Sequence, residues 1–335
     1  MGAPAPIGIV GAGSWGTALA ILLTRNGRPV RLWSVDRSEL DPLPGDRENK
    51  RFLPGCPFPE PLGIEFDLGK LVADCRDLLV VVPSHGFRDT LKQVAACKPR
   101  KLRLAWATKG FEIASGKLLH EVAREVLGDQ TPYAVLSGPT FAKEVARGMP
   151  TAVTIASNDA AFAADLAQAV ASPTFRAYTS DDLTGVEVGG TVKNIIAIGC
   201  GISDGLGFGA NARAALITRG LAEITRLGLK LGAKGETFQG LTGLGDLVLT
   251  CTDDQSRNRR MGLGLASGKS VQQVAQDIGQ VVEGVYAAEA VHVLASRLKV
   301  EMPICEQLYR ILHQGQDPRS AVEALMKRAL KSENG

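Results

Sequence analysis

This chain of 335 residues has no clustered cysteines, few aromatic residues, no long apolar run and almost no excess of one charge sign. The six cysteines form no Cys-x-x-Cys pair, and none stands at ligand spacing from a histidine, which argues against a disulfide framework and a metal site. Aromatic residues make up only 5% and the net charge is only +3, so no nucleic-acid partner is expected. The apolar runs, of which residues 78–82 are typical, are far too short for stable membrane insertion.

A secretory signal is also missing from the beginning of the sequence. The first residues are Met-Gly-Ala-Pro-Ala-Pro, without the basic segment and apolar stretch that mark a signal peptide. Together with the unpaired cysteines, this predicts a reducing, cytoplasmic location.

The length and the periodicity of the chain predict two domains. Up to about residue 185, short apolar runs alternate with helical stretches, which is typical of βαβ units. Beyond that point helical periodicity dominates. The sequence therefore predicts an α/β fold: a Rossmann-type, doubly wound, mostly parallel sheet in residues 1–185 and an all-helical domain in residues 186–335.

The individual elements follow from the same patterns. Strands are predicted at residues 7–10, 30–33, 78–82, 102–107 and 133–136. Helices are predicted at residues 17–25, 117–127, 192–198, 212–227, 271–278, 287–296 and 320–330. Residues 37–61, rich in proline, glycine and charge, are predicted to form a loop with one short helix.

A glycine-rich turn, Gly11-Ala-Gly13-Ser-Trp-Gly16, joins the first strand to the first helix. The first glycine allows the tight turn, the second lets the backbone approach a pyrophosphate, and the third permits close helix–strand packing. The following helix offers free N–H groups to the phosphates. The strand before and the helix after the turn make dinucleotide binding the preferred interpretation over a turn kept for packing alone.

The choice between NAD and NADP is left open by the residues after the second strand. Asp36 lies 20 residues beyond Gly16, where an acid usually accepts a hydrogen bond from the ribose 2′-hydroxyl of NAD. Arg31 and Arg37 are near enough to attract the 2′-phosphate of NADP instead. An exposed loop carboxylate is the alternative interpretation of Asp36.

Two lysines stand in unusual surroundings. Lys109 follows a predicted strand, at the sheet edge where ligands of doubly wound folds bind, although a solvated loop lysine is the alternative. Lys193 lies inside a largely apolar helix, and lysine is rarely buried without a partner. Burial lowers the pKa of an amine, so Lys193 is a candidate general base. A lysine that extends its amine to the solvent is the alternative.

Two later segments complete a candidate site. A glycine-rich turn presents Asp246, which can hold Lys193 and tune its charge. Ser256, Arg257 and Asn258 open a helix and offer N–H donors, a guanidinium and an amide to a phosphate. Three arginines so near a helix start oppose its dipole, which favours a bound anion over a simply capped surface helix.

These features predict a hydride-transfer enzyme for a small phosphorylated alcohol. Arg257 and Asn258 anchor the phosphate, while neutral Lys193 takes the hydroxyl proton as hydride leaves the same carbon. None of the four histidines has an acidic partner in an obvious relay, and a histidine-driven mechanism is not expected; His85, at a strand end, is the one near a cofactor edge.

Seven motifs resemble those of the bacterial NAD(P)-dependent glycerol-3-phosphate dehydrogenases, over residues 7 to about 330. They are GAGSWGTALA (11–20), ATKG (107–110), LSGPTFAKE (136–144), VKN (192–194), GFGANAR (207–213), GLGDL (243–247) and SRN (256–258). The resemblance implies interconversion of sn-glycerol 3-phosphate and dihydroxyacetone phosphate with NAD or NADP, and a role in phospholipid synthesis. It is also compatible with a homodimer. Many members carry a basic residue directly after the Trp-x of the second strand; here Val35 and Asp36 intervene before Arg37.

The resemblance also implies site residues. The proton acceptor is Lys193, and the catalytic group includes Asp246, Thr250 and Lys109. The implied substrate contacts are Lys109, Gly138, Thr140, Lys193, Asp246, Ser256, Arg257 and Asn258. The implied cofactor contacts are Ser14, Trp15, Lys109, Ala142, Arg257, Val281 and Glu283, beside the glycines and Asp36 or Arg37.

Two rival interpretations remain. Another two-domain reductase, of the hydroxyacid or ketopantoate type, would lack the phosphate seat. A non-catalytic NADP(H) sensor would bind the cofactor without turnover, and the pairing of Lys193 with Asp246 argues against it.

Overall fold

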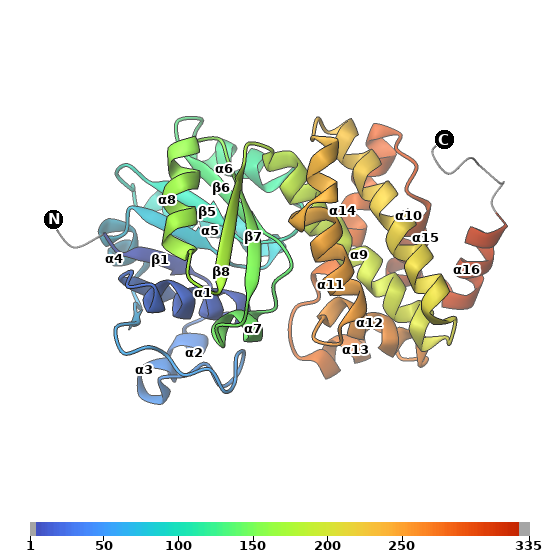
Figure 1. Ribbon diagram of the computed structural model, residues 1–335, viewed down its shortest axis with the longest axis horizontal. Helices are drawn as coiled ribbons and strands as arrows, with labels where there is room; N and C mark the ends of the chain where they lie inside the picture. Colours follow the sequence, from blue (N-terminus) through green and yellow to red (C-terminus); the bar gives the residue numbers. More distant parts are fainter. Residues whose placement is uncertain (1–4, 328–335) are drawn as a thin grey trace.

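An eight-stranded sheet and a separate group of helices form the two lobes of the chain (Figure 1), seen in a computed structural model that describes residues 5–327. The strand order is β3-β2-β1-β4-β5-β6-β7-β8, and every neighbouring pair is parallel except β6 and β7. The first six strands therefore follow the doubly wound order of dinucleotide-binding sheets. The strands are β1 Ile7–Val10, β2 Val30–Trp33, β3 Gly63–Ile64, β4 Asp77–Val80, β5 Arg103–Trp106, β6 Tyr133–Ser137, β7 Thr151–Ser157 and β8 Phe175–Ser180.

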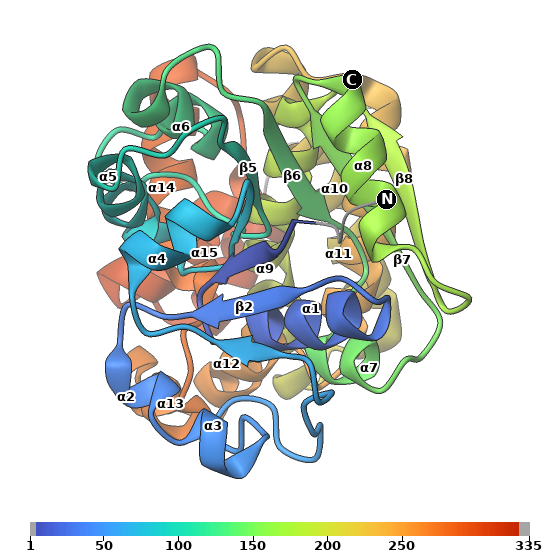
Figure 2. The same ribbon diagram turned by 90° about the vertical axis from the view of Figure 1, so that its left-hand side faces the viewer.

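Helices cover both faces of this sheet (Figure 2). On one face α4 contacts α5 and α5 contacts α6, and on the other α1 contacts α7 and α8. Two short helices, α2 and α3, and the 3-10 turn η1 lie in the connections. The bounds are α1 Ser14–Arg25, α2 Arg37–Leu40, α3 Leu43–Asp46, α4 Leu68–Asp74, η1 Ser84–Gly86, α5 Phe87–Ala96, α6 Leu119–Leu127, α7 Ala142–Ala146 and α8 Ala160–Val170.

The second lobe is built around α9, Leu183–Gly205, in which every residue from Gly185 to Ser203 is buried. A helix that is apolar all round needs packing partners on every side, and α10, α11, α12, α14 and α15 supply them. The remaining elements are α10 Gly209–Lys230, η2 Gly235–Gln239, the π-helical turn η3 Leu241–Gly245, α11 Asp246–Thr252, α12 Arg257–Ala266, α13 Val271–Ile278, α14 Glu283–Leu298, α15 Pro303–Gln314 and α16 Pro318–Met326.

The buried apolar side chains form two clusters, one for each lobe. The first runs from Ile7 to Val186 along the chain and the second from Val188 onward, with two exceptions. Phe111 and Leu118 follow β5, yet they belong to the second cluster. The connection from β5 to α6 is therefore packed into the helical lobe. The boundary between the two domains at residues 185 and 186 stays a prediction.

The α/β fold with a helical second part is confirmed, and several elements differ from prediction. Residues 37–61 contain two short helices where one was expected, and β7 and β8 lay outside the predicted strands. The edge strand β8 is largely polar and exposed, so it carries no run of apolar residues. Helix α9 begins at Leu183, nine residues before the predicted start at 192, because Asp182 caps it by accepting a hydrogen bond from Gly185 N. The end of the predicted helix 320–330 lies outside the described residues. Within residues 5–327, every helix is too short or too polar to cross a membrane.

Candidate active site

The glycine-rich turn after β1 has the shape that dinucleotide binding requires. Gly11 has φ +123°, and a Cβ on Gly16 would lie 1.9 Å from the carbonyl oxygen of Gly11, so neither position accepts a larger residue. A Cβ on Gly13 would meet nothing within 4 Å, which leaves open space before α1. Gly13 is the N-cap of α1 and makes no side-chain cap, so the first N–H groups of the helix remain available to phosphates.

Side chains around this turn also suit a dinucleotide. The buried Trp15 Nε1 has no hydrogen-bond partner in the described part of the chain. Ser14 Oγ lies 2.6 Å from the Phe52 carbonyl and 3.2 Å from Gln280 Oε1 of the helical lobe. Asn49 donates to the Ala12 carbonyl at 2.7 Å, which fixes the 37–61 connection over the turn. The available N–H groups, the open space at Gly13 and an unpaired indole N–H fit a pyrophosphate-bearing cofactor.

The three charged residues that were predicted to lie near the ribose have different partners. Asp36 caps α2 by accepting from Ser38 N at 2.9 Å, and these hydrogen bonds lower the pKa of its carboxyl. Arg31 is held by Glu65 at 3.2 Å and Asp74 at 2.5 Å, so its charge is already matched. Arg37 is largely exposed and pairs with a neighbouring carboxylate, a contact that contributes little at the surface. Of these three side chains, Arg31 is therefore the one most firmly held by carboxylates.

Lys193 lies at the centre of α9 with only 5% of its surface exposed. Its amine donates to Asp246 Oδ1 and, at 2.8 Å, to Thr250 Oγ1. Thr250 Oγ1 in turn donates to the Asp246 carbonyl at 2.6 Å, so Asp246 and Thr250 are fixed on one turn of α11. Lys109, which follows β5, donates to Asp246 Oδ2 at 2.7 Å. One buried carboxylate thus joins an amine from each lobe.

Burial lowers the pKa of Lys193 to about 7. The charge of Asp246 opposes this change, and the charge of Lys109 adds to it. The causes follow from the geometry, since the amine is enclosed by apolar helices and has one carboxylate and one ammonium beside it. Near neutral pH the amine can therefore exist in both protonation states, as a general acid and base must.

The remaining residues at the sheet edge lie on the same side as Lys109. Gly138 directly follows β6 with φ +154°, and a Cβ there would lie 3.0 Å from the Ala152 carbonyl oxygen. Thr140 donates to the Gly138 carbonyl at 3.2 Å, and Ala142 begins α7. The connection after β6 also reaches the turn before Asp246, because a Cβ on Gly245 would lie 3.7 Å from Pro139.

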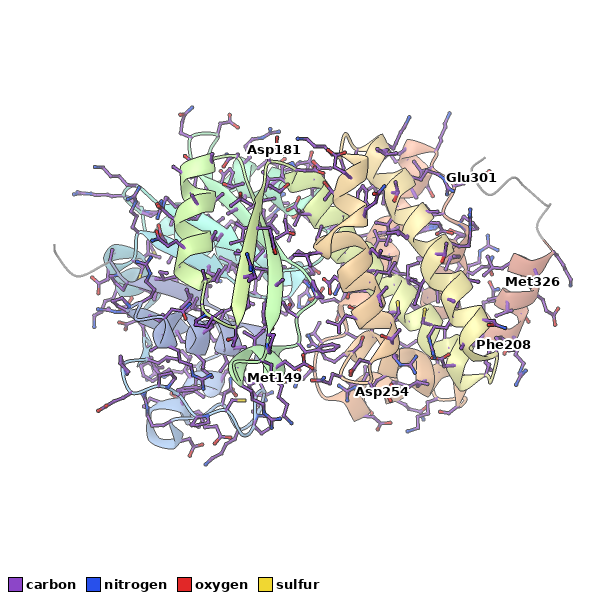
Figure 3. The ribbon with its side chains drawn as sticks, viewed as in Figure 1. Met149, Asp181, Phe208, Asp254, Glu301 and Met326 are labelled. Carbon is purple, nitrogen blue, oxygen red and sulfur yellow. The ribbon has the colours of Figure 1, made fainter. Side chains whose placement is uncertain are left out.

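At the start of α12, the Arg257 guanidinium donates a hydrogen bond to Gln280 Oε1 at 3.4 Å. Ser256 is the N-cap and accepts from Arg259 N at 3.2 Å. Arg259 forms ion pairs with Asp204 and with Asp254, which Figure 3 labels in the loop before α12. Arg257 has no carboxylate in ion-pair range among residues 5–327, and burial lowers its pKa. The three neighbouring arginines thus do not act as one anion site, because Arg259 is already paired with Asp204 and Asp254.

Asn258 is a buried bridge between helices. Its amide nitrogen donates to Asn194 Oδ1 at 2.9 Å, and its oxygen accepts from Gly284 N at 2.9 Å. Only one N–H of the Asn258 amide therefore remains for a phosphate. Asn194 directly follows Lys193, so this bridge fixes the amine relative to the start of α12.

Glu283 connects the lobes near the cofactor turn. It begins α14, two residues after Val281, and accepts from Ser84 Oγ at 2.7 Å in the turn after β4. Burial raises the pKa of its carboxyl, and the hydrogen bonds from Ser84 oppose that rise. A second set of contacts between the lobes therefore lies beside the glycine-rich turn.

Two histidines have acidic partners that the sequence did not indicate. His120 Nδ1 lies 2.6 Å from Glu187, and His292 Nδ1 lies 2.7 Å from Glu306. Each partner comes from another helix, so sequence neighbours gave no signal. His85 is exposed and its ring centroid lies 5.1 Å from that of Tyr286.

Comparison with known proteins assigns the chain to a family. The family model of the NAD-dependent glycerol-3-phosphate dehydrogenase N-terminus matches residues 6–163, and that of the C-terminus matches residues 182–323. The chain belongs to the NAD-dependent glycerol-3-phosphate dehydrogenase family. Within the family, a glycerol-3-phosphate dehydrogenase [NAD(P)+] of Vibrio cholerae is 56% identical over 333 residues, covering 99% of this chain and 97% of the relative. That of Idiomarina loihiensis is 54% identical, covering 97% and 98%.

A solved structure shares the whole fold of this family member. The glycerol-3-phosphate dehydrogenase of Coxiella burnetii superposes with a TM-score of 0.94 at 50% identity, covering 97% of this chain and 99% of that one. A D-mandelate dehydrogenase, at 15% identity and a TM-score of 0.65, shares only the fold.

Proposed function

We propose that the chain interconverts sn-glycerol 3-phosphate and dihydroxyacetone phosphate, with NAD or NADP as the hydride carrier. The observation that carries the proposal is the amine of Lys193, buried, held by Asp246 and Thr250, and titrating near neutral pH. Homologues of the same length bear the name of this activity. Arg257, which forms no ion pair within residues 5–327, supplies a cation for the phosphate.

The proton chemistry follows from the positions of the side chains. In oxidation, neutral Lys193 accepts the proton of the C2 hydroxyl; in reduction, its ammonium donates a proton to the C2 oxygen. The nicotinamide, when bound, supplies the hydride acceptor or donor. Asp246 holds the amine in place and stabilises its charged form, and Lys109 adds positive charge beside the C2 oxygen.

The binding groups are assigned on the same basis. Phosphate is placed on Arg257 with the remaining N–H of Asn258 and the start of α12, whose N-cap is Ser256. Gly138 and Thr140 border the substrate, with Lys109. The dinucleotide is placed along Gly11, Gly13, Ser14, Trp15 and Gly16, with Asp36 and Arg37 at the ribose and Ala142, Arg257, Val281 and Glu283 toward the nicotinamide.

The cellular setting is part of the proposal. None of the six cysteines is in a disulfide, which supports a reducing, cytoplasmic location. The product glycerol 3-phosphate fits a supply role for phospholipid synthesis, and a homodimer fits the resemblance to the family.

A spectrophotometric assay tests the activity. The protein should oxidise NADH or NADPH when dihydroxyacetone phosphate is added, and the ratio of the two KM values gives the cofactor preference. Unphosphorylated dihydroxyacetone and 2-ketopantoate are the matched controls and should react far more slowly. Faster turnover of 2-ketopantoate would favour the rival reductase, and tight cofactor binding without turnover of any ketone would favour the sensor.

The pH dependence of oxidation should report Lys193. Because the base must be neutral, kcat for oxidation should fall about tenfold for each pH unit below the pKa and level off above it, with the turning point at about 7. Reduction needs the ammonium, so its kcat should fall on the alkaline side instead. Profiles measured in both directions with saturating substrate check this, and an oxidation profile flat from pH 5 to 9 would contradict it.

Replacement of Arg257 by alanine should weaken substrate binding far more than catalysis. Loss of a charge-assisted phosphate contact is expected to raise KM for dihydroxyacetone phosphate by about tenfold to a hundredfold, at about 1.4 kcal/mol per tenfold. Arg260→Ala removes an exposed neighbouring cation and serves as the control. An equal rise of KM in both variants would show a general field effect and not a specific contact.

A further inference from the structure

The segment between β5 and α6 carries Lys109 into the helical lobe. We name residues 109–118 the strap. Lys109, at its start, bonds to Asp246, and Phe111 and Leu118 are 1% and 5% exposed within the second apolar cluster. The location of the Lys109 amine therefore depends on how the strap is held against the helical lobe.

The two halves of the strap lie side by side. Glu112 N donates to the Lys117 carbonyl at 3.0 Å, and Gly116 N donates to the Glu112 carbonyl at 2.7 Å, which closes a small loop. The half that begins at Lys109 is thus joined by backbone hydrogen bonds to the half that runs into α6. A contact that fixes the start of α6 therefore restrains both halves of the strap.

Glu187 of α9 fixes the start of α6. Its carboxylate is 4% exposed and accepts from His120 N at 3.0 Å and from His120 Nδ1 at 2.6 Å. Three residues along α9, a Cβ on Gly190 would lie 3.8 Å from Lys109 Cγ. Residues three apart lie on one side of a helix. One side of α9 therefore lies against Lys109 at the start of the strap and against His120 two residues beyond its end, and the next turn carries Lys193.

The charges around this contact are few. Burial raises the pKa of the Glu187 carboxyl, and His120 opposes that rise; Glu121 and Arg124 of α6 are the other charged neighbours of His120. Asp246 from α11 and Lys109 from the strap are the charged groups beside the Lys193 amine. Burying a carboxylate costs free energy because the charge loses its water. The Glu187 carboxylate is buried between α9 and α6, about two turns before Lys193 on α9.

We propose that Glu187 is a positioning residue, which acts through His120 and the strap to hold Lys109 at Asp246. The inference rests on the function proposed above, in which Lys109 borders the substrate. Glu187 itself touches neither Asp246 nor Lys193 through any hydrogen bond in residues 5–327.

The same kind of contact elsewhere in the chain provides a matched control. Glu223 of α10 is 3% exposed and accepts from Ile304 N at 2.7 Å and Cys305 N at 3.1 Å, at the start of α15. It holds a helix start within the helical lobe, away from the strap. Glu187→Leu and Glu223→Leu each remove one buried carboxylate with little change in volume, so both should lower the unfolding temperature.

Only Glu187→Leu should change catalysis. We expect kcat/KM for dihydroxyacetone phosphate to fall about tenfold to a hundredfold, and about twofold or less for Glu223→Leu. Because the ammonium of Lys109 lowers the pKa of Lys193, its displacement should also move the acid limb of oxidation to higher pH. Glu187→Gln, which can still accept from His120 N, should recover most of the loss. Equal kinetic effects of the two leucine variants would overturn the proposal.

A double-mutant cycle tests the route through Lys109. In a Lys109→Ala background, Glu187→Leu should reduce kcat/KM by about twofold at most, because the group it positions is gone. Full additivity of the two losses would exclude the route. If Glu187→Leu does not fold, His120→Ala is the alternative, because it keeps the backbone N–H to Glu187. It should lower kcat/KM and move the acid limb in the same directions, by smaller amounts.

Chemical labelling gives a measurement independent of turnover. Lys109 is ion-paired with 18% of its side chain exposed, so its acetylation by acetic anhydride, followed by mass spectrometry, should be slow. The rate should rise in Glu187→Leu and stay unchanged in Glu223→Leu. An unchanged rate in both would reject the positioning role, whereas a failure of the wild-type protein to reduce dihydroxyacetone phosphate would reject the proposed function alone.

Discussion

Lys193→Ala should lower kcat by about a thousandfold while leaving cofactor affinity near normal, since a positioned acid–base group contributes about 10²–10⁴ in rate. The amine is the buried base that titrates near neutral pH beside Asp246, and the glycine-rich turn lies in the other lobe. Pre-steady-state hydride transfer and fluorescence titration of NADPH measure the two quantities separately.

The variant also leaves space for a test by rescue. Small primary amines such as methylamine should restore part of the rate in proportion to their neutral fraction, because they fill the place of the lost side chain. Lys193→Met keeps the volume and should resist rescue, which makes it the control. Turnover of Lys193→Ala within about tenfold of the wild type would remove Lys193 from the mechanism.

Asp246→Asn should impair reduction more than oxidation. Without the carboxylate, nothing opposes the effect of burial and of Lys109, so the pKa of Lys193 should fall below its present value of about 7. At neutral pH the ammonium that reduction needs becomes scarce, and kcat for reduction should drop about a hundredfold and recover partly in acid. The acid limb of oxidation should move to lower pH.

Asp246→Asn should lower the free energy of unfolding by less than the loss of an ordinary buried ion pair does. Removal of one partner of a buried pair costs about 3–5 kcal/mol, but Lys193 can lose its proton and avoid a stranded charge. Asp204→Asn is the control, because Asp204 pairs with Arg213 and Arg259 away from Lys193. It should lower stability without moving either pH limb, and an identical shift in both variants would contradict the role of Asp246.

Local patterns predicted the parts of the site that lie within one segment. The glycine spacing at Gly11, Gly13 and Gly16 requires a strand before it and a helix after it, and both are present. A lysine within an apolar helix indicated a desolvated amine, and Lys193 is buried. Such predictions succeed because the residues that form the pattern and the structure that they determine lie within a few positions of each other.

Contacts between distant segments could not be predicted in this way. Glu187 lies 67 residues from His120, and Asn258 lies 64 residues from Asn194. Arg259 seemed part of an anion site until its pairing with Asp204 fixed it as structural. Gly138, Ala142, Val281 and Glu283 entered only through the family resemblance, because no local chemistry distinguishes a glycine, an alanine or a valine that lines a site.

The uninterrupted course of α9 determines which distances can vary during turnover. The helix carries Lys193 and, through Asn194 and Asn258, is tied to the segment that holds Arg257. The two groups proposed to bind the phosphate and the C2 oxygen therefore belong to one connected part of the helical lobe, and α9 sets the spacing between them. Because Lys109 reaches Asp246 from the other lobe, the charge beside the Lys193 amine depends on how the two lobes meet, and the acid–base step depends on it too.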